Sequence, residues 1–113
     1  MLYKKPKNDD KYLWTNHVVG KMLYYRISEG LVKRVVRFPK RIETGVAPET
    51  IACMQPTGSK NRPSEVWAMY QSIGEKKKKI ISAWRYPGVS KVGEPIPIPE
   101  DVLGALQEEG MDV

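Results

Sequence analysis

Cysteine and histidine are nearly absent from this 113-residue sequence, which contains one of each, Cys53 and His17. A single cysteine excludes a disulfide within the chain and any cysteine-rich zinc framework. One cysteine and one histidine are also too few for a conventional zinc site, because structural zinc is held by several such side chains. We therefore expect a reduced domain without metal or other cofactor, in which Cys53 belongs to the core.

Long hydrophobic runs are absent as well. No uncharged segment approaches the roughly 20 apolar residues that cross a bilayer as a helix. The first residues include lysines, but no apolar stretch follows them as in a secretory signal peptide. With 41% hydrophobic and 28% charged residues, the composition indicates one folded domain, which we expect to be cytoplasmic.

The common catalytic motifs are missing too. The sequence has no Gly-x-x-x-x-Gly-Lys-Ser/Thr phosphate loop, no Gly-x-Gly-x-x-Gly turn and no Gly-x-Ser-x-Gly elbow. Acidic residues between positions 42 and 91 are few, namely Glu43, Glu49, Glu65 and Glu75, whereas a two-metal nuclease needs several close together. An enzyme of this sequence is left with metal-independent chemistry on a phosphodiester, performed by basic residues, a phenol or an imidazole.

Charge is plentiful but unevenly placed. Residues 1–41 hold eleven Lys and Arg against three acids, a net charge of +8, and residues 42–91 hold eight against four, a net charge of +4. Residues 92–113 hold six acids and no base, a net charge of −6. A basic body with an acidic tail favours a polyanionic partner such as nucleic acid. The alternative is an ordinary basic surface that the tail merely balances.

Two helices are expected early in the chain. Thr15 and Asn16 are good N-cap residues for a helix that starts at His17 and runs to about residue 25. Ser28 is a good N-cap for a second helix, which Pro39 ends. The short join between them predicts a helical hairpin.

Strands follow the two helices. Alternating apolar residues and turn signals predict strands over residues 41–45, 50–55, 65–72 and 77–86, with a polar loop over residues 56–64. Residues 12–14 form an apolar stub that is either a short strand or an anchor beneath the first helix. Pro99 opens a last helix that ends at Gly110.

The expected fold is therefore α+β. Two N-terminal helices pack on a three- to four-stranded antiparallel sheet, and a C-terminal helix follows, with the helices on one face. Residues 1–11 are expected to be a flexible basic N-terminus. Residues 12–113 then form a single domain, whose acidic C-terminal segment spans residues 92–113.

The segment from Ile80 to Gly88 carries the most chemistry. Strict alternation places Ile81, Ala83 and Arg85 on one face of the strand and Ile80, Ser82, Trp84 and Tyr86 on the other. A guanidinium can bind a phosphate and stabilise charge that develops on it. The ring of Trp84 could stack on a base, and Tyr86 could move a proton. Alternatively, the strand is an aromatic core strand, with Arg85 in a salt bridge.

Other candidates are basic. The run from Lys76 to Lys79 could grip phosphates at a strand start, or it could be a solvated face. Arg26 and Arg41 could extend the basic surface, or they could form ordinary salt bridges. His17, at a helix start, could be a catalyst or a capping residue.

The order of these features resembles a known family. His17, Lys21-Met22, Arg26-Ile27-Ser28 and a valine-rich helix ending in Pro39 resemble the opening of a small bacterial domain family of unknown function. The stretch from Lys79 to Arg85 is similar to the Arg-Ile-Ile-Ser-Ala-Arg strand of BrnT-type toxins. Both groups are placed with the RelE/ParE toxin superfamily.

This resemblance implies a ribonuclease toxin that is neutralised by a small DNA-binding antitoxin. In such toxins the RNA 2′-hydroxyl attacks the adjacent phosphate, and basic residues stabilise the transition state without metal. By position, Arg85 matches the arginine that ends the family's strand, although Trp84 is inserted before it and shifts Arg85 to the other face. His17 matches the family histidine.

Our leading hypothesis is a toxin-type, RNA-binding protein that acts as a metal-independent endoribonuclease, with ribosome-bound mRNA as one candidate target. Arg85, Tyr86 and His17 are the candidate catalytic residues, and the candidate RNA-binding residues are Lys77, Lys79, Arg26, Arg41, Lys21 and Trp84. The alternatives are a non-catalytic RNA- or protein-binding module and a gyrase poison, because fold alone does not fix function. A further hypothesis is that the acidic tail folds across the basic body and restrains RNA binding.

Overall fold

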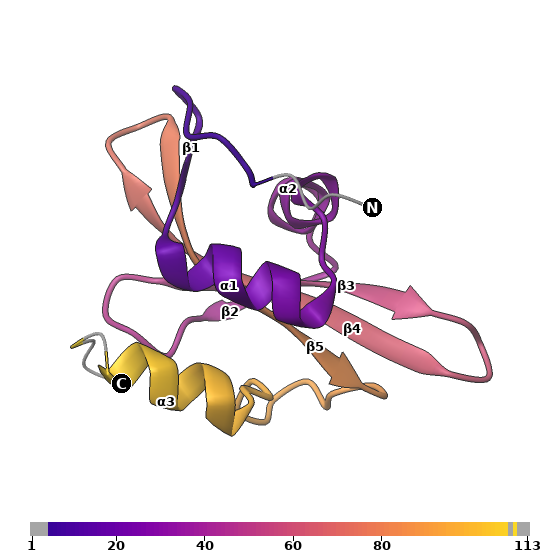
Figure 1. Ribbon diagram of the computed structural model, residues 1–113. Coiled ribbons are helices and arrows are strands. Elements are labelled where there is room, and N and C mark those ends of the chain that lie inside the picture. Colours follow the sequence, from indigo (N-terminus) through magenta and orange to yellow (C-terminus); the bar gives the residue numbers. More distant parts are fainter. Residues whose placement is uncertain (1–4, 109, 111–113) are drawn as a thin grey trace.

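The computed structural model describes residues 5–108 and residue 110. Within them the chain forms five strands and three helices (Figure 1), in the order β1 (Tyr12–Trp14), α1 (Asn16–Tyr25), α2 (Glu29–Arg37), β2 (Arg41–Thr44), β3 (Ile51–Gly58), β4 (Pro63–Ile73), β5 (Lys77–Pro87) and α3 (Glu100–Glu108). The α+β class, the two N-terminal helices and the C-terminal helix are confirmed.

The sheet differs from the expected one. Its strand order is β1-β5-β4-β3-β2, and β1 runs parallel to β5 while the other neighbours are antiparallel. The expectation of three or four antiparallel strands was therefore wrong: the sheet has five strands and is mixed. The additional strand is the stub at residues 12–14, which pairs with the edge of β5. Just before this stub, the carbonyl oxygen of Lys11 accepts a hydrogen bond from Lys78 N at 2.9 Å. A pairing that spans most of the chain has no local signal.

The two N-terminal helices begin where the sequence predicts. The Thr15 side chain accepts a hydrogen bond from Val18 N at 3.1 Å, and Ser28 Oγ accepts one from Leu31 N at 3.1 Å. Each cap satisfies one of the backbone N–H groups that a helix start leaves without a partner. Arg26, with φ of 56°, ends α1 in the left-handed region.

The helices cover both faces of the sheet, which corrects the expectation of one covered face. Core residues of α1 and α2 pack with Cys53, Ala68 and Ala83. On the other face, Val102 and Leu106 of α3 pack with Trp67 and Trp84 among others. Both faces need a cover because the central strands are apolar on both sides. The expected core position of Cys53 is confirmed, and burial raises the pKa of its thiol to about 11.

Strand β5 contains a bulge that changes which residues share a face. Tyr70 pairs with Ile80 and Met69 with Ser82, so that Ile81 has no partner on β4. Ile80 and Ala83 consequently pack in the α1–α2 core, whereas Ile81, Trp84 and Tyr86 pack on the α3 side. Strict alternation, which grouped Ile81 with Ala83, was wrong because a bulge resets the period of a strand.

The segment over residues 56–64 is mostly strand, not loop. β3 and β4 continue as a hairpin that projects from the body (Figure 1), and Thr57 pairs with Ser64 near its tip. Only residues 59–62 form the turn. Polar residues suffice here because backbone pairing, not burial, holds the two strands.

Residues 5–11 run beside β1. Pro6 is buried, and Asn8 Oδ1 accepts a hydrogen bond from Trp14 N at 2.7 Å. Residues 1–4 of the expected flexible segment lie outside the described residues, as do residues 109 and 111–113 of the acidic tail. No helix of the described chain is long and apolar enough to cross a membrane.

Asp101 ties α3 to α1. Its carboxylate accepts hydrogen bonds from Lys21 Nζ at 2.7 Å and from Tyr25 Oη at 2.9 Å. Desolvation raises the pKa of Asp101, but the hydrogen bonds from Lys21 and Tyr25 lower it more, so that its pKa lies below the usual value. Burial and the bond to Asp101 raise the pKa of Tyr25.

We predict that Asp101→Asn lowers the free energy of unfolding by about 1 kcal/mol or less at pH 7, because the Asp101 side chain is 42% exposed and solvent screens the pair. A folded-state pKa below the unfolded value of 3.8 contributes stability above that value and loses it as the pH falls through the folded pKa. The difference between wild type and variant should therefore shrink in urea unfolding at strongly acidic pH. A constant difference would contradict this account.

Candidate functional site

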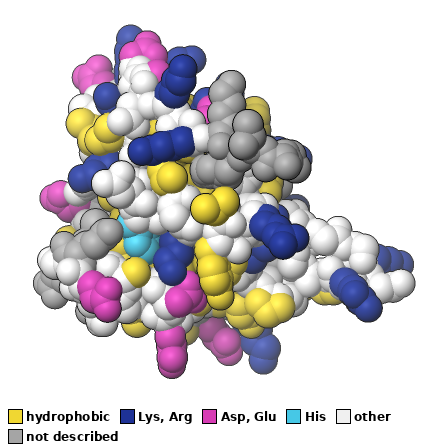
Figure 2. Space-filling view, viewed as in Figure 1, with side chains coloured by type: hydrophobic (Ala, Val, Ile, Leu, Met, Phe, Trp, Pro, Cys, Tyr) yellow, Lys and Arg dark blue, Asp and Glu magenta, His cyan; other side chains and the backbone are white. Residues whose placement is uncertain are grey.

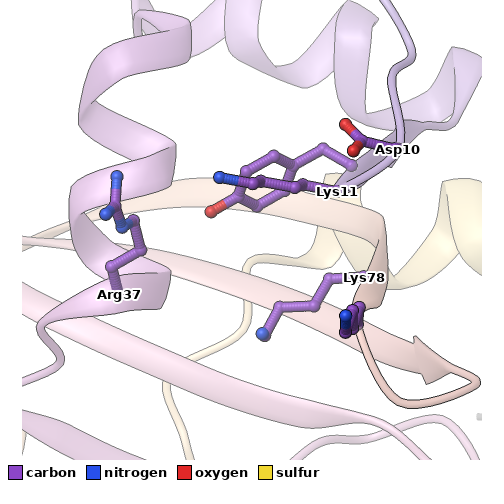
Figure 3. A pocket seen from close by; sticks show the side chains of 6 residues that line it. Asp10, Lys11, Arg37 and Lys78 are labelled. Atoms are coloured by element: carbon purple, nitrogen blue, oxygen red, sulfur yellow. The ribbon is translucent and has the colours of Figure 1, made fainter.

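A basic pocket lies where β1, the end of α2 and the start of β5 meet. Its volume is about 450 Å³, and its lining residues are Asp10, Lys11, Tyr12, Arg37, Lys76 and Lys78. Figure 3 shows Lys11, Arg37 and Lys78 reaching towards the same hollow from three segments, with Asp10 at its margin. We call this the Lys11–Lys78 pocket.

The parallel pairing of β1 with β5 builds this pocket. Tyr12 stands opposite Lys78 in the register, so that both side chains lie on the face that α2 covers. Asp9 stabilises the backbone at the start of β1, since its Oδ1 accepts hydrogen bonds from Lys11 N at 2.8 Å and Tyr12 N at 2.7 Å. These two backbone bonds lower the pKa of the Asp9 carboxyl. The pocket therefore depends on a strand that the sequence only hinted at.

The cations of the pocket are not neutralised. Among the described residues, no ion pair involves Lys11, Arg37, Lys76 or Lys78, and Asp10 is the one acid that lines the pocket. Lys78 Nζ lies 5.6 Å from the centre of the Tyr70 ring, and Arg37 lies 5.8 Å from that of Phe38. Arg37 also suits the C-terminal turn of α2, where the helix dipole favours a positive charge. Four cations against one carboxylate make this hollow suited to an anion.

Two of the predicted RNA-binding residues are instead paired inside the fold. Lys21 bonds Asp101 of α3, as described above. Arg41 is buried, bonds Glu43 at 2.5 Å and Ser90 Oγ at 2.8 Å, and lies over the Trp67 ring. Their charges are already balanced by neighbouring carboxylates, as the salt-bridge alternative has it.

Arg85 holds the end of α1. Its Nε donates to the carbonyl of Tyr25 at 2.9 Å, and its Nη2 donates to that of Arg26 at 3.1 Å. These carbonyls belong to the end of the helix, where backbone acceptors lack partners within the helix. Arg26 itself is exposed. The guanidinium thus has a structural partner, although not the salt bridge that the sequence suggested.

We predict that Arg85→Ala lowers the free energy of unfolding by about 1–2 kcal/mol, because two charge-assisted hydrogen bonds are lost at a half-exposed site. Urea unfolding followed by circular dichroism measures this change. Arg34→Ala is the matched control, since Arg34 is exposed and its side chain forms no hydrogen bond among the described residues. Equal stability of wild type and Arg85→Ala would show that this guanidinium does not support α1.

The candidate catalytic residues do not meet. His17 is buried, with Nε2 2.8 Å from Ser82 Oγ. Tyr86 is half-buried on the α3 side of the sheet, whereas Arg85 reaches to the end of α1. Trp84 is fully buried and stacked on Trp67, with ring centres 6.1 Å apart, and so presents no ring face to a base.

The lysine run is split between the two faces of β5. Lys76 and Lys78 line the pocket, so that Lys77 and Lys79, the two chosen from the sequence, point to the opposite side by alternation. Lys11 and Arg37 are the pocket residues that sequence reasoning missed, whereas Lys76 and Lys78 belong to the run that it considered but are not the two lysines that it chose. The lysine run was the available signal, but which of its members share a face depends on where the strand begins. Lys11 and Arg37 come close to the run only through tertiary packing.

Comparison with known proteins adds no family to this description. A scan against protein-family models, a search of curated proteins and a search of solved structures each found no match for this chain. The resemblance to RelE/ParE-type toxins therefore stays a prediction from sequence motifs. Among the described residues, no group of three His, Cys, Asp or Glu side chains is placed to hold a metal ion.

Proposed function

We propose that this domain binds RNA through its phosphates at the Lys11–Lys78 pocket. The observation that carries the proposal is the gathering in one hollow of four cations that form no ion pair with a described residue, in a protein whose net charge is +6. Lysine and arginine bind phosphate oxygens through charge-assisted hydrogen bonds. Binding of this kind positions the nucleic acid without reading its sequence.

The distribution of charge supports a polyanion at this end of the molecule. In Figure 1, β1 and α3 lie at opposite ends, and α3 carries Glu100, Asp101 and Glu108. Figure 2 shows several acidic side chains along the edge where α3 lies, whereas the rest of this face carries scattered Lys and Arg together with a few acidic side chains at the top and left. The acidic side chains of α3 repel a polyanion from that end of the molecule.

The burial of Tyr12 disfavours recognition of RNA bases by aromatic stacking in this pocket. Among the described residues, Tyr12 is the one aromatic residue that lines the pocket, and it is 8% exposed with Lys33 lying over its ring at 5.3 Å. The described lining therefore offers an RNA base no open aromatic face. We expect affinity to depend on charge and little on sequence.

The toxin-type ribonuclease implied by the resemblance is the alternative. It needs a site that joins basic residues to a group that moves protons, and Arg85, Tyr86 and His17 are dispersed. A non-catalytic RNA-binding module needs only the pocket. We therefore favour the module, and we leave neutralisation by a small DNA-binding antitoxin as part of the toxin alternative.

The test is the salt dependence of RNA binding, measured by fluorescence anisotropy with a labelled single-stranded RNA. If the pocket neutralises between one and four phosphate charges, the slope of the logarithm of affinity against the logarithm of salt concentration should lie between about −0.7 and −3, since each phosphate contact on a single strand contributes about −0.7. No binding at low salt, or binding that salt leaves unchanged, would overturn the proposal.

The same samples decide between the module and the ribonuclease. On a denaturing gel the RNA should stay intact after incubation with the wild-type protein. New RNA fragments that disappear with Arg85→Ala would establish the ribonuclease alternative, provided that the variant is shown to be folded by circular dichroism.

A further inference from the structure

We infer that the Lys11–Lys78 pocket takes the phosphorylated 5′ end of an RNA, an inference that rests on the proposed function and narrows its ligand. A groove that tracks a strand sets its cations along the path of the nucleic-acid backbone. Here Lys11 just before β1, Arg37 of α2, Lys76 in the turn before β5 and Lys78 of β5 line one hollow of about 450 Å³. One group of high negative charge satisfies such an arrangement better than successive phosphodiesters do.

The charge balance points to a terminal phosphate. Four cations and the Asp10 carboxylate leave the pocket at +3. A phosphodiester within the strand carries one negative charge, whereas a phosphate monoester carries about −1.5 to −2 at neutral pH and has three acceptor oxygens. A 5′-phosphate, or the longer phosphate chain of a 5′-triphosphate, therefore matches the excess charge more closely.

Asp10 and Tyr12 fit the same ligand. A carboxylate at the margin of the pocket repels the next phosphodiester of the strand, but it can accept a hydrogen bond from a ribose hydroxyl of the terminal nucleotide. The Tyr12 hydroxyl forms no hydrogen bond with any described residue, so that it is available to donate to a phosphate oxygen in the pocket. The lining thus offers donors for one phosphate group and an acceptor for the sugar beside it.

The experiment compares three RNAs of about 12 nucleotides, a length within the site sizes of small single-strand-binding domains. They share one sequence and a 3′ fluorophore, and they carry a 5′-hydroxyl, a 5′-monophosphate or a 5′-triphosphate. At physiological salt we expect the monophosphate to bind about tenfold more tightly than the hydroxyl, because it adds charge-assisted hydrogen bonds in the pocket. Arg37→Gln should reduce this ratio severalfold, whereas Lys91→Ala, at an exposed lysine outside the pocket, should leave it unchanged.

The outcomes separate this inference from the proposed function. Equal, salt-sensitive affinity for all three RNAs would overturn the preference for the 5′ end and leave the RNA-binding proposal standing. No binding of any RNA would overturn both. A preference that Arg37→Gln and Lys11→Ala both leave intact would place the 5′ end elsewhere and overturn the assignment to this pocket.

A free nucleotide shares the phosphate chemistry and is distinguished by competition. Adenosine 5′-monophosphate should displace the 5′-monophosphate RNA only at concentrations far above the dissociation constant of that RNA, because the RNA adds contacts beyond its first nucleotide. Displacement at matching concentrations would identify a free nucleotide as the ligand and contradict the RNA-end assignment.

Discussion

The double variant Lys11→Ala/Lys78→Ala is expected to bind single-stranded RNA about 30-fold more weakly than the wild type, because each lost charge-assisted contact costs about five- to tenfold in affinity. Both lysines line the pocket and neither is held in an ion pair with a described residue. Removing two cations of the pocket should also make the salt slope shallower, by up to about 1.4 at about 0.7 for each phosphate charge that is no longer neutralised. Anisotropy titrations at several salt concentrations give both quantities.

The matched control is Lys60→Ala/Lys91→Ala, which removes the same charge from exposed positions outside the pocket. It should lower affinity much less and leave the slope nearly unchanged. Equal weakening by the two double variants would show that net charge, rather than the pocket, binds the RNA. Circular dichroism spectra of both proteins establish that the comparison is made between folded molecules.

Trp84→Ala is expected to lower the free energy of unfolding by about 3–5 kcal/mol, the usual cost of removing a large aromatic side chain from a core. Trp84 is fully buried, and its ring lies nearly parallel to that of Trp67, at an interplanar angle of 5°. Its Nε1 has no hydrogen-bond partner among the described residues, so the loss is one of packing and not of a polar contact. Against a typical total of about 5–15 kcal/mol, such a loss is large.

Urea unfolding followed by far-ultraviolet circular dichroism measures this effect, and Trp84→Phe is the control that keeps an aromatic ring. The phenylalanine variant should be destabilised clearly less than the alanine variant, since it leaves a smaller cavity. Near-native stability of Trp84→Ala together with a loss of RNA affinity would contradict the core role. That result would favour base stacking on Trp84 instead.

The helices of this fold could be predicted from the sequence, because their signals are local. Two helices start at the caps Thr15 and Ser28, whose side chains accept hydrogen bonds from the first turn. Pro39, which lacks a backbone N–H, follows the end of the second helix, and Pro99 lies directly before α3. The local sequence signal for β1 is weaker than the signals for the helices. Its three residues are stabilised by pairing with β5, more than 60 positions away, and no local pattern records that partner.

The site was predictable only in part, for the same physical reason. The lysine run was visible, yet which of its members share a face depends on the register of β5. The partners of Arg85 could not be predicted, because its acceptors are backbone carbonyls at the end of α1 that only the folded chain brings near. Lys21 is paired with Asp101, 80 residues away, which no local pattern shows, whereas Arg41 is paired with Glu43, two residues along β2.

The most direct test of the central claim is to map the RNA contact by nuclear magnetic resonance. An unlabelled 5′-phosphorylated RNA is titrated into isotope-labelled protein, and the shifts of the backbone amides are followed. Binding at the pocket predicts the largest changes at residues 10–12, at Arg37 and at residues 76–78. Changes centred instead on Arg26, Arg85 and Tyr86, with the pocket amides unmoved, would contradict it.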